Sequence, residues 1–169
     1  MGKIISIVNQ KGGVGKTTTT VNLGAAIALE NKKVLIIDFD QQANAPITLG
    51  IRREQVEKDI VDFLIDDVIT TKHVIKTEVN NLDLVCASLR ISNLEEYLKD
   101  IDEKNLALSK KLNSIKNIYD YVLIDCPPAL GLTIDNALYA SDSVIIPVEC
   151  SFYAYDALTQ MVTKINEIQ

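Results

Sequence analysis

The sequence is poor in the residues that build disulfide-stabilised or zinc-binding proteins. Its 169 residues include only three cysteines and one histidine, His73. Cys86, Cys126 and Cys150 are widely separated, odd in number, and form no CxxC pair. A disulfide framework and a zinc site are therefore not expected, and we interpret His73 as a structural or exposed residue.

Long apolar runs and a secretion signal are also missing. The longest apolar runs reach about five or six residues, whereas a helix needs about 20 to span a bilayer. Residues 1–3 are followed at once by the strand-like run IISIV, without the small-residue cleavage site of a signal peptide. We therefore expect a cytoplasmic protein with no membrane anchor.

An excess of positive charge is absent as well. The chain has 23 acidic and 17 basic side chains, for a net charge of -6. Such a surface does not attract nucleic acid as a whole, so any DNA contact is expected to need a local basic patch, a partner, or residues outside this chain. The composition is ordinary for a globular protein, and the length suits one domain over residues 1–169.

Short β-branched runs alternate with helical patterns along the chain. The predicted strands are Lys3–Val8, Lys33–Ile37, Leu82–Cys86, Tyr121–Asp125 and Ser143–Val148. The predicted helices are Lys16–Glu30, Glu54–Ile65, Asp67–Ile75, one or two within Leu94–Asn117, Thr133–Ala140 and Tyr153–Ile168. Apolar strands joined by helices predict an α/β fold with a mostly parallel sheet covered on both faces. The last helix reaches Gln169 without a cap, so we expect the chain to be part of a longer protein.

A phosphate-binding loop is predicted between the first strand and the first helix. Residues 11–18 read KGGVGKTT, in which Gly15, Lys16 and Thr17 match the second half of the pattern GxxxxGK[ST]. Gln10 stands where the first glycine of that pattern would fall, so the loop is a variant. Lys16 is expected to contact the β- and γ-phosphates and Thr17 to bind Mg²⁺. The alternative is a plain glycine-rich turn, which would not require these residues in this order.

Carboxylates follow two other predicted strands. Asp38 and Asp40 close the second strand, and Asp125 closes the fourth. Because ligands of open parallel sheets bind beyond the carboxyl ends of the strands, we expect these acids beside the phosphate loop. A carboxylate there can hold Mg²⁺ or orient an attacking water. An acidic cap at the end of a strand is the alternative.

Three segments resemble the deviant phosphate-loop ATPases of the ParA and MinD type. Lys11 matches the extra signature lysine of that family. The segment DFDQQAN, which starts at Asp38, is similar to DxDPQGN, with Gln41 in place of proline and Ala43 in place of glycine. The segment YVLIDCPP resembles a Walker B strand followed by the DxPP switch. The resemblance is strongest in residues 3–46 and 119–153.

The resemblance implies a role for each residue of these segments. Nucleotide contacts would come from Lys11, Gly12, Gly13, Val14, Gly15, Lys16, Thr17 and Thr18. Lys11 and Lys16 would stabilise negative charge during hydrolysis, with Lys11 acting across a dimer interface, and Asp40 would be the hydrolytic residue. The Mg²⁺ site would involve Thr17, Asp38, Asp40 and Asp125.

The resemblance also implies a function and partners. The expected function is that of a ParA-type ATPase of plasmid or chromosome partition, a P-loop protein that binds ATP with Mg²⁺ and dimerises in the ATP state. The expected partners are a second copy, a centromere-binding protein of the ParB type, and non-specific DNA. The residues that contact DNA and the adenine base are expected after residue 169.

Three other functions remain open from the sequence. The first is a MinD-like membrane-cycling ATPase, although the last helix lacks a basic face. The second is a reductase like the nitrogenase iron protein, in which Cys126 and Cys150 would bind a bridging iron–sulfur cluster. The third is a nucleotide-gated scaffold with little turnover, against which the pair of Asp38 and Asp40 argues.

Overall fold

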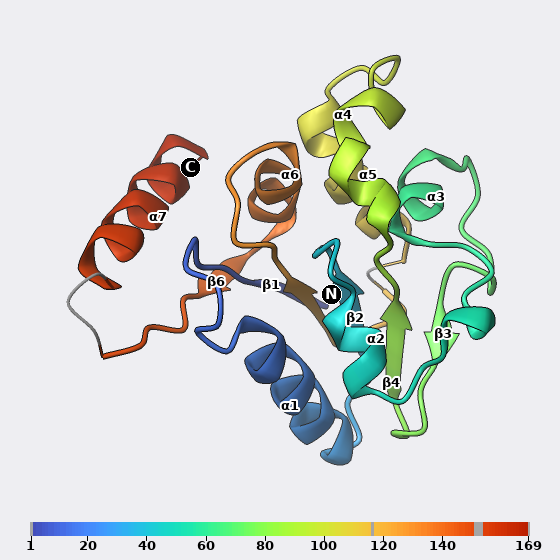
Figure 1. The fold of residues 1–169 in the computed structure, drawn as a ribbon. Helices are drawn as coiled ribbons and strands as arrows, with labels where there is room; N and C mark the ends of the chain where they lie inside the picture. The colour runs from blue at the N-terminus through green and yellow to red at the C-terminus, as the bar shows by residue number, and fades with distance from the viewer. Residues whose placement is uncertain (1, 116, 151–153, 169) are drawn as a thin grey trace.

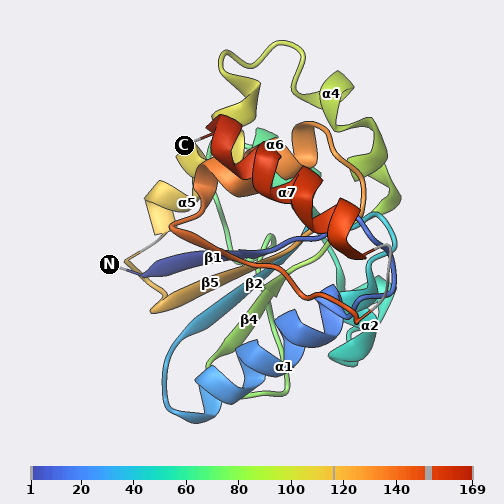
Figure 2. The ribbon, with the colours of Figure 1, turned by 90° about the vertical axis from the view of Figure 1, so that its left-hand side faces the viewer.

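The computed structural model describes residues 2–115, 117–150 and 154–168. Within these residues, six strands form one sheet in the order β3-β4-β2-β5-β1-β6 (Figures 1 and 2). The strands are β1 (Lys3–Ile7), β2 (Val34–Asp38), β3 (Ile75–Lys76), β4 (Leu82–Val85), β5 (Tyr121–Asp125) and β6 (Ser143–Ile145). The β3–β4 pair is antiparallel and the other pairs are parallel.

Helices cover both faces of this sheet. They are α1 (Lys16–Leu29), α2 (Asn44–Thr48), α3 (Ile60–Ile65), α4 (Leu94–Tyr97), α5 (Ala107–Ile115), α6 (Leu132–Ala140) and α7 (Ala154–Ile168). In Figure 1, α1 and α2 lie on one face, and α3, α5 and α6 lie on the other. The helix α7 packs on the outer side of α6.

The central strand β2 shows why the sheet needs two covered faces. All of its residues are fully buried. Leu35 and Ile37 belong to the core under α3, α5 and α6, whereas Val34 and Ile36 pack with α1. Successive side chains of a strand point to opposite faces, so both sets must be apolar. Gly24 of α1 faces this strand, and a Cβ there would lie only 3.0 Å from Cδ1 of Ile36.

The predicted α/β class with a mostly parallel sheet is confirmed, and each of the five predicted strands forms with shifts of a few residues at its ends. The strand β3 is missing from the prediction, because two residues at a sheet edge give no readable pattern. Among the described residues, no helix is both long and apolar enough to cross a lipid bilayer.

The helix predicted over Glu54–Ile65 is too long at its start. A short 3₁₀ turn covers Arg53–Gln55, and α3 begins only at Ile60. The reason is Asp59, whose carboxylate accepts the N–H of Val61 at 2.8 Å and so caps the helix. An aspartate at this position fixes the first turn and ends the preceding extended segment.

The helix predicted over Asp67–Ile75 is wrong, because His73 holds this segment as a loop. The buried ring accepts the N–H of Thr70 at Nδ1, at 3.0 Å, and its Nε2 lies 3.0 Å from the carboxylate of Asp66. A backbone N–H can only donate, so Nε2–H is the group that donates to Asp66. Four consecutive β-branched residues, VITT, also disfavour a helix here. His73 is therefore structural.

The remaining helices agree with the sequence more closely. Leu94–Asn117 contains α4, a 3₁₀ turn over Lys104–Leu106, and α5. Glu103 has a φ of 56°, a left-handed conformation that separates α4 from α5. The last predicted helix is present to Ile168, while its predicted first residue, Tyr153, lies outside the described residues.

Replacing His73 by alanine should destabilise the protein by about 2–4 kcal/mol, because a buried ring and its two hydrogen bonds are lost. Urea unfolding followed by circular dichroism measures the change. The control is Lys72→Ala, which removes only an exposed ion pair with Glu57 and should cost less than about 0.5 kcal/mol. Equal stabilities of the two variants would contradict the structural role of His73.

Candidate functional site

The predicted phosphate loop joins β1 to α1 at the carboxyl edge of the sheet. Gly13 and Gly15 have φ angles of 76° and 89°, which L side chains adopt only at a cost of about 1–2 kcal/mol. Gly15 is the residue before α1, and within the described residues no side chain caps this helix and no acid lies in its first turn. The N–H groups of the first turn are thus left for another acceptor, which suits an anion such as phosphate.

Lys16 is the buried cation of this loop. Its side chain is almost covered, and its ammonium donates to the carbonyl oxygen of Lys11 at 3.1 Å. Burial lowers the pKa of Lys16, while the negative charges of Asp125 and Asp40 act in the opposite direction. The ammonium therefore lies within electrostatic reach of both carboxylates.

Thr17 and Asp125 meet where α1 approaches the end of β5. The carboxyl group of Asp125 accepts a hydrogen bond from the Thr17 side chain, and Oδ1 lies 3.4 Å from the hydroxyl of Thr20. Its other oxygen, Oδ2, is buried with no partner among the described residues. Burial is the main reason that the pKa of Asp125 rises to about 6. A buried acceptor without a donor fits the hydration shell of a divalent ion.

Asp38 lies beside Asp125, because parallel β2 and β5 place these two residues in register. Asp38 is fully buried, and its carboxylate accepts the N–H groups of Asp40 at 3.0 Å and Ala45 at 3.3 Å. Burial, and then the charge of Asp125, raise the pKa of Asp38 well above its usual range. Both oxygens of Asp38 hold the following loop, so this geometry favours a positioning role over direct contact with a metal.

Asp40 lies in the turn that Asp38 shapes. Its Oδ1 accepts the N–H of Gln42 at 3.0 Å, and its carbonyl accepts the N–H of Ala43 at 2.9 Å. Ala43, which stands where the resemblance expects glycine, has a φ of 49°. An alanine in this left-handed conformation is strained by about 1–2 kcal/mol. Asp38 and Asp40 together supply four acceptors to residues 40–45, and these hydrogen bonds offset that cost.

Lys11 lies against the segment that follows β6. Its ammonium forms an ion pair with Glu149. Its backbone N–H donates to Oδ1 of Asn9 at 2.9 Å, and Nδ2 of Asn9 donates to the carbonyl of Pro147 at 2.7 Å. Asn9 therefore ties the start of the loop to residues 147–149.

The structure brings most predicted site residues together at the ends of β1, β2 and β5, which are neighbours in the sheet. Gly12 and Thr18 are exposed on the loop and Val14 is half-buried. In the part of the chain that the structure describes, no group of three or more His, Cys, Asp or Glu side chains could hold a metal. A divalent ion held beside Thr17 and Asp125 would take its remaining oxygen ligands from water or a bound ligand.

Sequence reasoning missed three residues of this region: Asn9, Thr20 and Glu149. Thr20 had a readable signal, since it lies one helical turn after Lys16 and therefore on the same face of α1. Asn9 had a weaker one, as a polar residue directly after a strand. Glu149 is far from the loop in sequence, and only the pairing of β6 with β1 brings it near Lys11.

A family model described as an AAA domain matches residues 2–169. The sporulation initiation inhibitor protein Soj of Bacillus subtilis is 47% identical over 169 residues, which cover 100% of this chain and 67% of Soj. The chain belongs to the Soj/ParA family of P-loop ATPases. It spans between 53% and 67% of the length of the curated relatives that it matches.

Solved structures agree with the Soj/ParA fold. A putative plasmid partition protein of Borrelia burgdorferi bound to AMPPNP superposes with a TM-score of 0.85 at 33% identity, over 99% of this chain and 71% of that one. A Mycobacterium smegmatis protein named cobyrinic acid a,c-diamide synthase, with an ATP analogue and magnesium, gives 0.93 at 30% identity, over 100% and 67%. The second name shows that one fold carries more than one named activity.

The MinD-like and nitrogenase-like alternatives are not favoured. The curated relatives include chromosome-partitioning proteins at 39–41% identity. Cys126 is fully buried and its thiol points to the carbonyl of Ile124 at 3.7 Å. Burial raises the pKa of Cys126 far above that of a free thiol, whereas an iron–sulfur cluster needs thiolates.

Asp125→Asn should stabilise the metal-free protein at pH 7.5 by about 2 kcal/mol. A carboxyl whose pKa in the folded state is about 6, above its unfolded value, favours folding at low pH and loses this contribution as pH rises through 6. The gain should shrink as pH falls from 6 to 4. Urea unfolding in EDTA at pH 7.5 and 4.5 measures it.

The control for this experiment is Asp67→Asn, an exposed position that should change stability by less than about 0.5 kcal/mol at either pH. A loss of stability in Asp125→Asn at pH 7.5 would show that the carboxylate is stabilised in the folded protein, contrary to its burial without a partner at Oδ2.

Proposed function

We propose that this chain carries the ATPase site of a ParA-type partition protein. The observation that carries the proposal is the meeting of three groups at adjacent strand ends. These are the uncapped start of α1 with Lys16, the contact of Thr17 with Asp125, and the turn that holds Asp40. The 47% identity of this chain to Soj over 169 residues supports the same function.

Each of these groups has a task in hydrolysis of the γ-phosphate. The N–H groups of residues 12–18 and the ammonium of Lys16 bind the phosphate oxygens. Asp40 orients the water that attacks the γ-phosphorus, and ADP leaves with the electrons of the broken P–O bond. Thr17 and Oδ2 of Asp125, the latter through water, would hold Mg²⁺, which neutralises phosphate charge when bound.

Lys11 takes part through a second copy of the chain. Its ammonium pairs with Glu149, while its carbonyl accepts the ammonium of Lys16. The proposed role is to reach the nucleotide of the partner subunit in an ATP-bound homodimer, in the manner of an arginine finger. To do so, Lys11 would have to leave its ion pair with Glu149.

The proposed partners and location follow from the same function. They are a centromere-binding protein of the ParB type and non-specific DNA, which would be bound through residues after 169. The proposed location is the cytoplasm, and no membrane contact is proposed. Turnover of ATP, measured with and without DNA and the ParB-type partner, separates this function from a scaffold that binds nucleotide without hydrolysis.

Lys16→Ala should abolish measurable ATP binding, because the buried cation of the phosphate loop is lost. Titration calorimetry with ATP and Mg²⁺ provides the measurement. Lys32→Ala is the control, since this exposed lysine lies in the loop between α1 and β2, at the opposite edge of the sheet. Undiminished affinity in Lys16→Ala would exclude the phosphate loop as the binding site.

Asp40→Ala should retain ATP binding while hydrolysis falls by about 100-fold or more. Phosphate release gives the rate and calorimetry gives the affinity; any dimer should persist, because ATP is not consumed. Asp40→Asn is the matched variant, since its carbonyl can still accept the N–H of Gln42. If Asp40→Asn hydrolysed ATP at the normal rate, the residue would shape the turn and would not orient water.

A further inference from the structure

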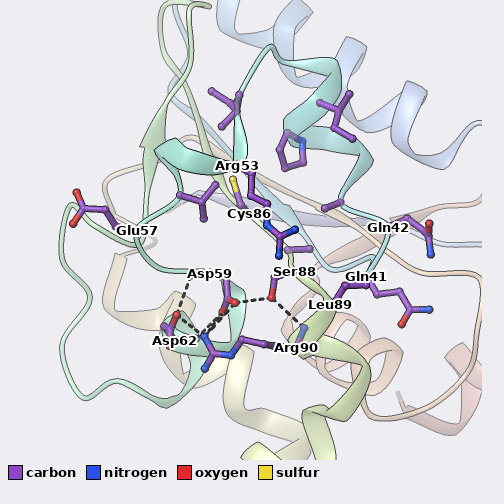
Figure 3. A pocket seen from close by; sticks show the side chains of 16 residues that line it. Gln41, Gln42, Arg53, Glu57, Asp59, Asp62, Cys86, Ser88, Leu89 and Arg90 are labelled. Carbon is purple, nitrogen blue, oxygen red and sulfur yellow. Dashed lines mark hydrogen bonds and ion pairs between the residues drawn. The ribbon is translucent and has the colours of Figure 1, made fainter.

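A second cavity lies beside the phosphate site, on the other side of the Asp40 turn. Its volume is about 510 Å³, within the usual range for small-molecule sites. The walls come from the segment Gln41–Ala43, from α2, from residues 51–57, from the start of α3, and from residues 86–90 (Figure 3). No residue of the phosphate loop is among its lining residues.

The floor and rim of this cavity are apolar. Pro46, Ile51, Val56 and Ala87 line it, and the rim carries two large side chains, Ile47 and Leu89. Ile47 is 71% exposed and Leu89 is 66% exposed. Water in such a cavity is in contact with apolar surface, so an apolar group that displaces it gains free energy.

Most charged side chains that line the cavity already have an oppositely charged partner. Arg90 donates to Asp62 at 2.8 Å and to both oxygens of Asp59 at 3.2 Å, and Glu57 pairs with Lys72. Figure 3 shows the bonds of Arg90 to Asp59 and Asp62 along one wall of the cavity. Ser88 donates to Asp59 at 2.6 Å and closes the same network. Because one guanidinium serves two carboxylates, this wall keeps an excess of one negative charge, held within a hydrogen-bonded network.

Arg53 is the exception among the charged lining residues. It lines the cavity, it points its guanidinium toward the centre of the pocket (Figure 3), and across the described ranges it forms no ion pair. A guanidinium offers several N–H donors in a plane and binds carboxylate or phosphate groups well. The cavity thus combines an apolar floor with one anion-binding group.

The turn that holds Asp40 also forms part of the cavity wall. Gln41, Gln42 and Ala43 line it, and the N–H groups of Gln42 and Ala43 are the ones that Asp40 accepts. A molecule seated against these residues cannot avoid restricting the turn. Ala43 has a left-handed backbone, and its N–H is bound to the carbonyl of Asp40, so contact with Ala43 acts on the residue that holds the carboxylate.

We propose that this cavity binds a small amphipathic anion, with an apolar body on the floor and a carboxylate or phosphate on Arg53, and that the bound anion slows hydrolysis by immobilising the Asp40 turn. The binding half stands on the cavity alone. The effect on hydrolysis rests on the function proposed above.

The first experiment tests binding by calorimetry on the chain without nucleotide. The probes are octanoate and octyl phosphate, and the neutral 1-octanol and the short anion acetate are the comparisons. Saturable binding of octanoate or octyl phosphate, with none of 1-octanol or acetate, is expected, and the tighter of the two identifies the preferred head group. Failure of both amphipathic anions to bind, or equal binding of 1-octanol, would overturn the site.

Matched variants place the probe in the cavity. Arg53→Gln should weaken binding by roughly tenfold or more, the effect of losing a charged hydrogen bond. Arg52→Gln changes the neighbouring arginine, which does not line the cavity, and should bind the probe normally. Val56→Trp fills the floor without altering charge and should also abolish binding. Binding that survives in both Arg53→Gln and Val56→Trp would locate the probe elsewhere.

The second experiment measures ATP turnover with saturating probe. The wild-type rate should fall by roughly fivefold or more, the size of a typical coupling between two sites, and Arg53→Gln should keep its rate. An unchanged wild-type rate would overturn the coupling. Absence of turnover before any probe is added would instead refute the proposed function, while the calorimetry would still decide the binding site.

Discussion

The register of two parallel strands places Asp38 of β2 directly beside Asp125 of β5, and the rest of the site depends on this pairing. Neighbouring strands lie about 4.8 Å apart, so two buried carboxyl groups share one small volume. Burial raises the pKa of both carboxyl groups, and the charge of Asp125 raises that of Asp38 further, so the two ionised groups are unfavourable without other partners. Hydrogen-bond donors around Asp38 and Asp125 offset part of the free energy that burying these two carboxyl groups costs.

These groups come from different parts of the chain and explain its layout. The N–H groups of Asp40 and Ala45 stabilise Asp38, while Thr17 and Thr20 of α1 stabilise Asp125. One oxygen of Asp125 is still unsatisfied, and the buried ammonium of Lys16 is held by a carbonyl and not by a carboxylate. A divalent ion would give Oδ2 of Asp125 a partner, and an anionic ligand would give one to the ammonium of Lys16. Binding would therefore stabilise this arrangement, which is the physical basis of a nucleotide-dependent switch.

The turn after β2 lies between the phosphate site and the cavity that Arg53 lines. One side of residues 40–43 faces the phosphate site through Asp40, and the other side forms a wall of the second cavity. The segment after β6 is joined to the start of the phosphate loop, because Asn9 binds the carbonyl of Pro147 and Lys11 pairs with Glu149. Local hydrogen bonds thus hold the turn, whereas the start of the phosphate loop is held by a segment that is distant in sequence.

The sequence by itself determined the α/β class, the phosphate loop and the three acids at strand ends, because glycine spacing and apolar runs are local patterns that physics links directly to backbone shape. It failed between residues 54 and 75, where Asp59 sets the start of α3 and His73 holds a loop, both through hydrogen bonds that no periodicity reveals. Only the tertiary structure decided that Asp38 holds a turn, that Glu149 pairs with Lys11, and that Arg53 faces a cavity. Each of these depends on strand order and register, which join residues that are far apart along the chain.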